Sequence, residues 1–439
     1  MLFLQKKLIP FLFFIAPFMG YSQAGFNYAG LTRSLGSQRY QPANLGARDE
    51  TFGVSVDAAG WVTNSGFTLK GVFDKNGYIT EETRNRMVES VGKNFGMNAG
   101  YKLGLINLNF RLGELNTSVF IDQQYGASIS LTNPKTAGLI LLGNRPYKGQ
   151  TVTEDKIRFI YSGVRSYGVG AGINRDQLKA GIRLKFLQGF SYGELKNSFL
   201  SITTSEDAVA LDISANYDMA ISNTGKYGLL SGKGLGAGLD AGLSYELNDN
   251  MTADIAVLDA GFITWRKVDK MVKHVENVHF EGINVANLFS SSTSLDTAVQ
   301  QAVDSLKGLI LPDTINGNQT RMAGTTIRAG VNIKIGENTS IYPQICWIPF
   351  SANGYMRLPA LNVSIRHNVG EALVFGANVY GGGSDLYGFG LMGGIHAEIN
   401  GVAAIQFQIM ADNILGLFLP SIGRGFSVQA GLGFDILGQ

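Results

Sequence analysis

This chain has little charge, little proline and a single cysteine. Of its 439 residues, 16% are charged, 10 are Pro, and Cys346 is the one cysteine. A lone cysteine excludes a disulfide scaffold, and 36 basic against 34 acidic residues give no excess that would attract nucleic acid. A hydrophobic content of 45% excludes a disordered chain. Although 57 residues are Gly, they lack a three-residue period, which excludes collagen.

The first 22 residues have the pattern of a secretory signal. Lys6 and Lys7 precede an apolar stretch over residues 8–19, and small residues come before position 23. The stretch is too short for a spanning helix, and no apolar extension supports the less favoured alternative, an uncleaved anchor. We therefore expect residues 1–22 to be removed on export. Without Lys6 and Lys7, the chain has 34 basic and 34 acidic residues.

Beyond this segment the chain has no apolar run of 18 residues, and what it repeats is a two-residue alternation. The clearest case is the run 178–186, in which apolar residues alternate with Gly and basic ones. Its apolar face is Leu178, Ala180, Ile182, Leu184 and Phe186, and its polar face is Lys179, Gly181, Arg183 and Lys185. Similar runs occur at 117–131, 209–219, 327–335, 403–410 and 426–436. Each predicts a strand with one apolar and one polar face.

Such strands fit either a soluble sandwich or a membrane barrel. The runs reach 10 residues or more, which matches a tilted crossing of a bilayer better than the five or six residues usual in soluble sheets. Their polar faces hold Gly and charges, as a lumen does, and the links between runs alternate between short and long. We therefore predict an all-β protein, an antiparallel up-and-down transmembrane β-barrel over residues 51–439 with a few short helices in its loops.

The links give a strand count. The short links are 113–116, 174–176, 205–207, 248–250, 336–338, 370–371 and 400–401. Eight longer ones separate them, among them 188–196, 222–233 and a long insertion with helical spacing at 266–322. Short periplasmic turns and long outer loops then predict about 16 strands, or 14 if the weak strand at 199–203 belongs to a loop. Helices are also predicted at 80–93 and 134–142.

Residues 23–50 precede the barrel as an N-terminal periplasmic or hatch segment. They contain the run Gln41, Pro42, Ala43, Asn44, Leu45 and Gly46. This run resembles the Asn-Pro-Ala-x-Leu stretch of FadL-type outer-membrane barrels, which include PorV-like subunits of Bacteroidota protein secretion, although Gln41 replaces the usual Asn. The resemblance implies a hatch inside a 14-stranded barrel. The whole layout, including the closing strand 426–434, resembles even more a Bacteroidota outer-membrane barrel family of undefined function (DUF5723-like).

The polar faces also predict a group of charges in the lumen. The candidates are Lys179, Arg183, Lys185, Asp212, Asp218, Arg328 and Lys334. Confined charges need partners, so we expect a salt-bridged network across the interior. It either fills the barrel or lines a polar constriction.

Two other motifs carry little chemistry. Gly189-Phe190-Ser191-Tyr192-Gly193 matches the pattern of a hydrolase nucleophile, but the residues that follow read as a loop instead of a helix. The cluster His274, Glu276, His279 and Glu281 has poor spacing for zinc. We therefore expect no catalytic residue, no metal and no cofactor.

The resulting hypothesis is a non-enzymatic barrel in the outer membrane of a Gram-negative bacterium. As the resemblance implies, it would give passage to small molecules, hydrophobic ones included, and hold a hydrophobic or detergent-like ligand in its lumen. The alternative is an accessory or interaction subunit of a Bacteroidota outer-membrane (type 9) secretion complex, with a protein partner. The bilayer is the expected partner in both cases, and nucleic acid in neither.

Overall fold

A computed structural model describes residues 37–47, 50–64, 80–91, 95–223, 232–280, 313–349, 359–382, 387–412 and 425–437. The elements begin with the short 3-10 helices η1 (Ser37–Arg39) and η2 (Pro42–Leu45). The strands of the first half are β1 (Glu50–Asn64), β2 (Phe95–Leu112), β3 (Leu115–Leu131), β4 (Thr151–Glu154), β5 (Arg158–Arg175), β6 (Leu178–Thr204), β7 (Leu211–Asn223), β8 (Gly234–Asn248) and β9 (Met251–Phe280). Those of the second half are β10 (Asp313–Met322), β11 (Thr326–Ile335), β12 (Thr339–Trp347), β13 (Ala360–Val369), β14 (Leu373–Gly382), β15 (Tyr387–Ile399), β16 (Ala403–Asp412) and β17 (Gly425–Leu437).

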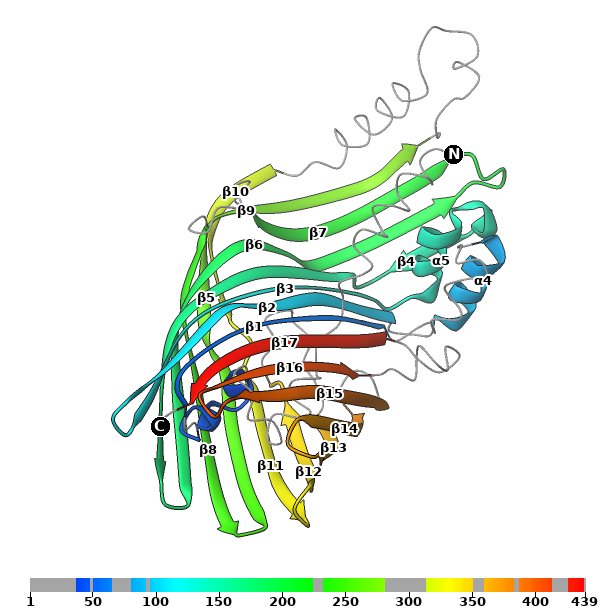
Figure 1. The fold of residues 1–439 in the computed structure, drawn as a ribbon. Helices are drawn as coiled ribbons and strands as arrows, with labels where there is room; N and C mark the ends of the chain where they lie inside the picture. The colour runs from blue at the N-terminus through cyan, green and yellow to red at the C-terminus, as the bar shows by residue number, and fades with distance from the viewer. Residues whose placement is uncertain are drawn as a thin grey trace, which may run out of the picture.

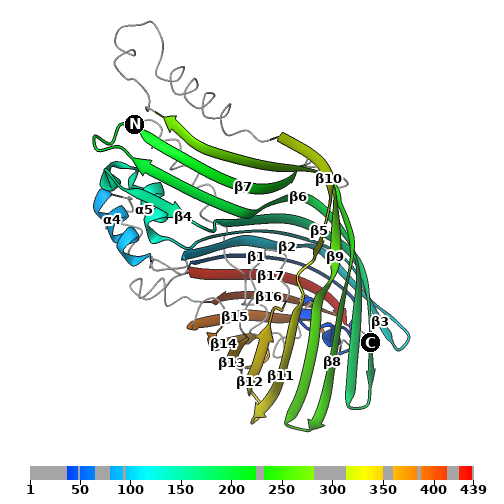
Figure 2. The same cartoon turned by 180° about the vertical axis from the view of Figure 1, so that it is seen from behind.

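The strands form one closed antiparallel barrel (Figures 1 and 2). It closes because β1 pairs with β2 on one side and with β17 on the other. The 27-residue β6 and the 30-residue β9 are each long enough to pair with two shorter strands in succession along one edge. Counted this way, the strands in the described part of the chain occupy 14 positions, with β4/β5, β7/β8 and β10/β11 each sharing one.

The count of 14 is confirmed, but the count of 16 is wrong for a specific reason. Residues 188–196, expected to be a loop, lie within β6, whose first half pairs with β8 and whose second half pairs with β7. The segment 199–203 is the end of this same strand. The link 205–207 therefore lies at the end of the barrel opposite the six other short turns. β7 and β8 run in the same direction on either side of residues 224–233, so that link adds no strand.

The outward face of the barrel is apolar. On β6 the side chains of Ile182, Leu184 and Phe186 are exposed, whereas Arg183 and Lys185 between them are buried. On β13 exposed Val363 and Ile365 alternate with inward polar residues in the same way. A closed ring leaves no unpaired edge, and an apolar exterior around a polar interior is the arrangement that lipid requires. These features place the strands in a membrane.

The two described α-helices lie at the end opposite the six short turns. α4 (Glu81–Ser90) and α5 (Pro134–Leu142) confirm the helices expected at 80–93 and 134–142, and they lie side by side there (Figure 1). Asn133 is the N-cap of α5, and its side chain accepts a hydrogen bond from the Lys135 amide. Among the described residues, no helix is both long enough and apolar enough to cross a bilayer.

The insertion expected at 266–322 is shorter than predicted at both ends. β9 continues to Phe280 and β10 begins at Asp313, because the two strands pair with each other across 262–272 and 313–322. The expected helix within the insertion lies outside the described residues, as do the signal at 1–22 and residues 23–36 of the N-terminal segment.

Candidate functional site: a plugged lumen

The N-terminal residues Ser37–Gly46, here called the plug, lie inside the barrel. Their described side chains are buried with the exception of Asn44, which is partly exposed. Gln38 donates a hydrogen bond to Asn109 of β2 at 2.7 Å, and Tyr40 donates one to Gln429 of β17 at 3.1 Å. Residues 37–46 thus contact the inner side of the wall at β2 and β17.

Local sequence explains the shape of the plug. Gln41 is the N-cap of η2, and its side-chain oxygen accepts a hydrogen bond from the Ala43 amide. Pro42 follows at the first helical position, where its missing N–H is not needed and its fixed φ favours the turn. Leu45 then points into the wall and is fully buried. The motif from Gln41 to Gly46 thus forms one compact turn.

Glycines on the inward face of the wall make room for this turn. A Cβ atom built on Gly181 of β6 would lie 1.9 Å from the carbonyl oxygen of Pro42. One on Gly172 of β5 would lie 2.4 Å from the Gly46 nitrogen, and one on Gly242 of β8 would lie 2.3 Å from Oε1 of Gln41. No real Cβ tolerates such distances, so these positions require Gly for the plug to dock as it does.

A continuous chain of ion pairs joins the plug to the wall. Arg39 pairs with Asp57 of β1 and with Asp122 of β3. Asp122 also pairs with Arg183 at 3.4 Å, and Arg183 pairs with Asp240 of β8 at 3.2 Å. Three further ion pairs extend the series from β6 to β9 and β2. They are Lys185–Asp240, Lys185–Asp259 and Lys102–Asp259. We call these eight residues the ion-pair chain.

The ion-pair chain is electrically balanced and removed from solvent. It holds four cations and four carboxylates, and only the side chains of Lys102 and Asp259 are more than one-tenth exposed. The Arg183 guanidinium also lies 3.7 Å from the centre of the Phe120 ring. Buried ions of this kind are costly to separate, because each one left alone has lost its hydration. The ion-pair chain therefore holds Arg39, and with it the plug, in this docked position.

Asp254 of β9 is a second point of attachment. It accepts a hydrogen bond from Nε2 of Gln41 at 2.8 Å and pairs with Arg328 of β11 at 3.0 Å. Tyr342 of β12 donates to it at 2.9 Å and also contacts Arg328. Arg328 and Tyr342 are fully buried. The plug is thus held to the β9–β12 side of the wall as well.

Of the seven charges predicted to lie together, the structure brings Arg183 and Lys185 into the ion-pair chain and Arg328 to Asp254. Lys179 pairs with Glu246 at 2.6 Å near the short-turn end, and Lys334 donates to the backbone oxygen of Asp249 in a short turn.

The other two predicted charges, Asp212 and Asp218, do not join this group. They lie on β7, which pairs with the second half of β6, away from Arg183. Asp212 there contacts His279 at 2.6 Å, with both side chains 55% exposed.

The acidic partners were not predicted. Asp240 is the direct cross-strand neighbour of Arg183, and Asp122 and Asp57 reach Arg39 from different strands. Asp122 and Asp240 occupy polar-face positions, which is the signal that could have suggested them. Only strand register shows which cation each one meets.

The other motifs are not assembled for catalysis or metal binding. Ser191 lies within β6, where it pairs with Asn223, instead of on a strand-to-helix turn. His274 contacts Glu276 on the same strand, with both side chains more than half exposed. Within the described ranges, no three His, Cys, Asp or Glu side chains are grouped so that they could hold a metal ion. Glu281, the fourth member of the predicted cluster, lies outside them.

Together these features define a class: a transmembrane β-barrel of the outer-membrane type whose lumen is occupied by its own N-terminal segment. The sequence from residue 42 to residue 412 matches the family of unknown function DUF5723, so the chain belongs to that family. No curated protein matches it.

The comparison with solved structures gives matches at low identity. A FadL homologue from Pseudomonas aeruginosa shares 11% identity, covering 96% of this chain and 100% of its own, with a TM-score of 0.46. The toluene transporter TodX from Pseudomonas putida shares 9% identity, covering 97% and 100%, with a TM-score of 0.44. The translocator domain of the autotransporter NalP from Neisseria meningitidis shares 9%, covering 89% and 90%, with a TM-score of 0.30.

Proposed function

We propose that this protein is a non-enzymatic outer-membrane channel for small molecules, and that the plug is its gate. The observation that carries the proposal is the chemistry of the plug's attachment. Arg39 and Gln41 hold it through ion pairs and a hydrogen bond to β1, β3 and β9, Gln38 and Tyr40 add hydrogen bonds to β2 and β17, and glycines receive its backbone. Polar contacts depend on direction and distance, so a small displacement breaks several of them together.

A permanent filling of the lumen has no need for such contacts. Apolar packing would hold a segment in place without the desolvation cost of buried ions, and replacing buried ion pairs by apolar side chains is often neutral or stabilising. An electrically balanced attachment suits a segment that has two positions. We expect hydrophobic solutes among the molecules that pass through the channel, and toluene serves as a test solute for them.

The test is to remove the plug and, separately, to lock it. Deleting residues 37–46 should raise single-channel conductance in planar bilayers severalfold, because it empties space that the wall glycines leave open. For the lock, Gln38→Cys and Asn109→Cys are combined in a Cys346→Ser background, since these two side chains are in direct contact. Oxidation with a short dithiol linker should lower uptake of toluene and of glycerol by proteoliposomes, and a reductant should restore it. Gln38→Cys alone is the matched control.

If neither variant conducts or takes up solute differently from the parent, the gate is refuted. A barrel that stays sealed even without its plug would support the alternative, an accessory subunit of a secretion complex. That alternative remains a prediction from the sequence resemblance.

A further inference from the structure

Three basic residues, here called the basic cluster, meet where β8 begins beside β9: Lys233, Arg266 and Lys267. The Arg266 amide donates a hydrogen bond to the Lys233 carbonyl oxygen at 3.0 Å, so these two residues are cross-strand neighbours. Lys267 follows in a bulge of β9, where Arg266 and Lys267 together oppose Asn318 of β10. Arg266 and Lys267 are exposed, and Lys233 is half-buried.

The basic cluster lies on the outward face of the wall. Phe262 of β9 is 50% exposed on this face, whereas Trp265 is buried. Because side chains alternate along a strand, Arg266 shares the face of Phe262. A Cβ atom built on Gly234 would lie 2.8 Å from the Trp265 ring, so Gly234 is on the opposite face and Lys233, just before it, points outward.

Three successive rows of cross-strand neighbours on this outward face change from apolar to basic. The first row is apolar and consists of Ala237, Phe262 and Met322. The second row carries hydroxyl groups and consists of Leu235, Thr264 and Thr320, with the two threonine Oγ1 atoms 3.0 Å apart. The basic cluster and Asn318 form the third row. This order is the one that a lipid presents from its acyl chains to its headgroup.

The height of these rows matches the edge of the bilayer. From Tyr245, near the short turn at 248–250, to Ala237, β8 rises about 27 Å along the strand and about 20 Å along the membrane normal at the usual tilt. The apolar band of such barrels is about 25 Å tall, so it ends between Phe262 and the basic cluster. Since the short turns of these barrels face the periplasm, the basic cluster lies among the headgroups of the outer leaflet.

The protein itself supplies no counter-charge to the basic cluster. Among the ion pairs of the described residues, none includes Lys233, Arg266 or Lys267, and Asp269, two residues further along β9, forms none with them. Like charges that face each other across strands destabilise a sheet, and this repulsion falls when an anion lies between them. Lys267 also has a left-handed backbone, with φ at 52°, and strain of this kind is concentrated at functional positions.

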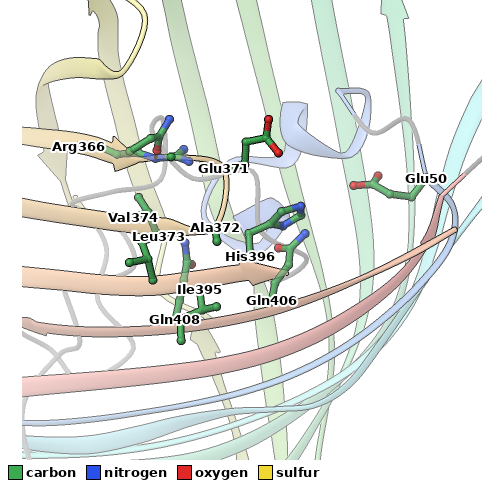
Figure 3. A pocket seen from close by; sticks show the side chains of 12 residues that line it. Glu50, Arg366, Glu371, Ala372, Leu373, Val374, Ile395, His396, Gln406 and Gln408 are labelled. Carbon is green, nitrogen blue, oxygen red and sulfur yellow. Dashed lines mark hydrogen bonds between the residues drawn. The ribbon is translucent and has the colours of Figure 1, made fainter. Parts of the chain in front are cut away.

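The cavity at the short-turn end of the lumen, with a volume of about 470 Å³, differs in this respect (Figure 3). Its lining combines Arg366 and Glu371 with the apolar side chains of Leu373 and Ile395. Arg366 already donates a hydrogen bond to Asn368 at 3.1 Å. Charges of both signs lie there, so the lining selects no single class of ion, whereas the basic cluster is cationic throughout.

We propose that the basic cluster binds the phosphate group of an anionic lipid in the outer leaflet. The phosphate lies among Lys233, Arg266 and Lys267, and the acyl chains lie along Phe262 and Met322. In an outer membrane the lipid with this chemistry is the phosphorylated glycolipid, lipid A. The site is on the outer surface of the wall, so it does not depend on the gate.

The experiment measures lipid binding to the full-length barrel in detergent by native mass spectrometry. The barrel is titrated with diphosphorylated lipid A and with the same lipid after removal of its phosphates. Each basic residue near a lipid phosphate strengthens binding about fivefold, so removal of the phosphates should weaken binding about a hundredfold. A large excess of inorganic phosphate should not displace lipid A, because it lacks the acyl chains that contact Phe262 and Met322.

Variants assign the binding to the basic cluster. Lys233→Gln, Arg266→Gln and Lys267→Gln should each lower the affinity for lipid A about fivefold, and their combination about a hundredfold. A matched control removes the same net charge from exposed residues elsewhere and should bind lipid A as the parent does; it combines Arg111→Gln, Lys148→Gln and Arg175→Gln. Heat-modifiable migration in gels confirms that each variant is folded.

Four results would overturn the proposal. They are equal binding of lipid A and its phosphate-free form, full affinity in the combined variant, an equal loss in the matched control, and displacement of lipid A by inorganic phosphate. Because lipid binding and conductance are separate readouts, a failure here leaves the gated channel standing. A failure of the conductance tests would likewise leave the lipid site standing.

Discussion

Replacing Arg39 by Gln should release the plug from the wall. Arg39 is buried and pairs with two carboxylates, those of Asp57 and Asp122. Removing one partner of a buried ion pair costs about 3–5 kcal/mol, because the other partner stays desolvated. Asp122 keeps Arg183, so the loss falls mainly on Asp57 and the lower figure applies. About 3 kcal/mol shifts the balance between docked and released plug by roughly a hundredfold.

The assay is thiol accessibility of the plug. Ser37 is 3% exposed, and Ser37→Cys in a Cys346→Ser background changes little volume. A membrane-impermeant maleimide should label this cysteine about a hundredfold faster when Arg39→Gln is added, if labelling follows the released population. Adding Asp57→Asn removes the stranded carboxylate and should slow labelling again.

Arg111→Gln, at an exposed residue of the short-turn end, is the matched control and should leave the rate unchanged. The reasoning is refuted if labelling in Arg39→Gln stays within about threefold of the parent, or if Asp57→Asn added to it gives no rescue.

The remaining predictions concern the wall, the lipid face, the helical end and the absence of catalysis. Gly181→Val should expose the plug to added protease while the barrel stays folded, whereas Gly393→Ala, where a Cβ meets nothing within 4 Å, should not. Leu184→Arg puts a charge on the lipid face and should lower barrel stability in denaturant by up to about 2–4 kcal/mol, falling toward zero if the position is near the interface. The Glu154 carboxylate beside α5 accepts hydrogen bonds from the backbone amides of Thr132 and Asn133, so Glu154→Ala should accelerate hydrogen exchange in α5. Ser191→Ala should leave any esterase activity of the preparation unchanged, and a loss of activity would contradict the non-enzymatic proposal.

The strand predictions succeeded where alternation was regular and failed where a strand changes its partner. Six short turns and the two described α-helices, α4 and α5, lie where the sequence indicated. The segment 188–196 looked like a loop because it is rich in Gly and polar residues, yet its backbone continues β6. An irregularity in the pairing with β5 lies there, between the partners of Gly163 and Val164. A bulge shifts the alternation of apolar and polar residues by one position, and in the sequence this shift has the same pattern as the end of a strand.

For the site, the sequence indicated the plug and part of its attachment. The run Gln41 to Gly46 was noticed through its resemblance to a family motif. Arg183, Lys185 and Arg328 were noticed because each places a charge on the polar face of a predicted strand. Arg39 carried no signal, since it lies in a polar segment with weak periodicity.

The sequence by itself determined the class of this protein. An alternation of apolar and polar residues is a local property, and it decides which face of each strand meets lipid whatever the strand pairs with. Tertiary structure alone decided which charges meet. Asp240 reaches Arg183 only through the register of β6 with β8, and Arg39 meets Asp57 and Asp122 only because wall glycines leave room for the plug in the lumen. Register and docking depend on the closure of the whole ring, which no local pattern encodes.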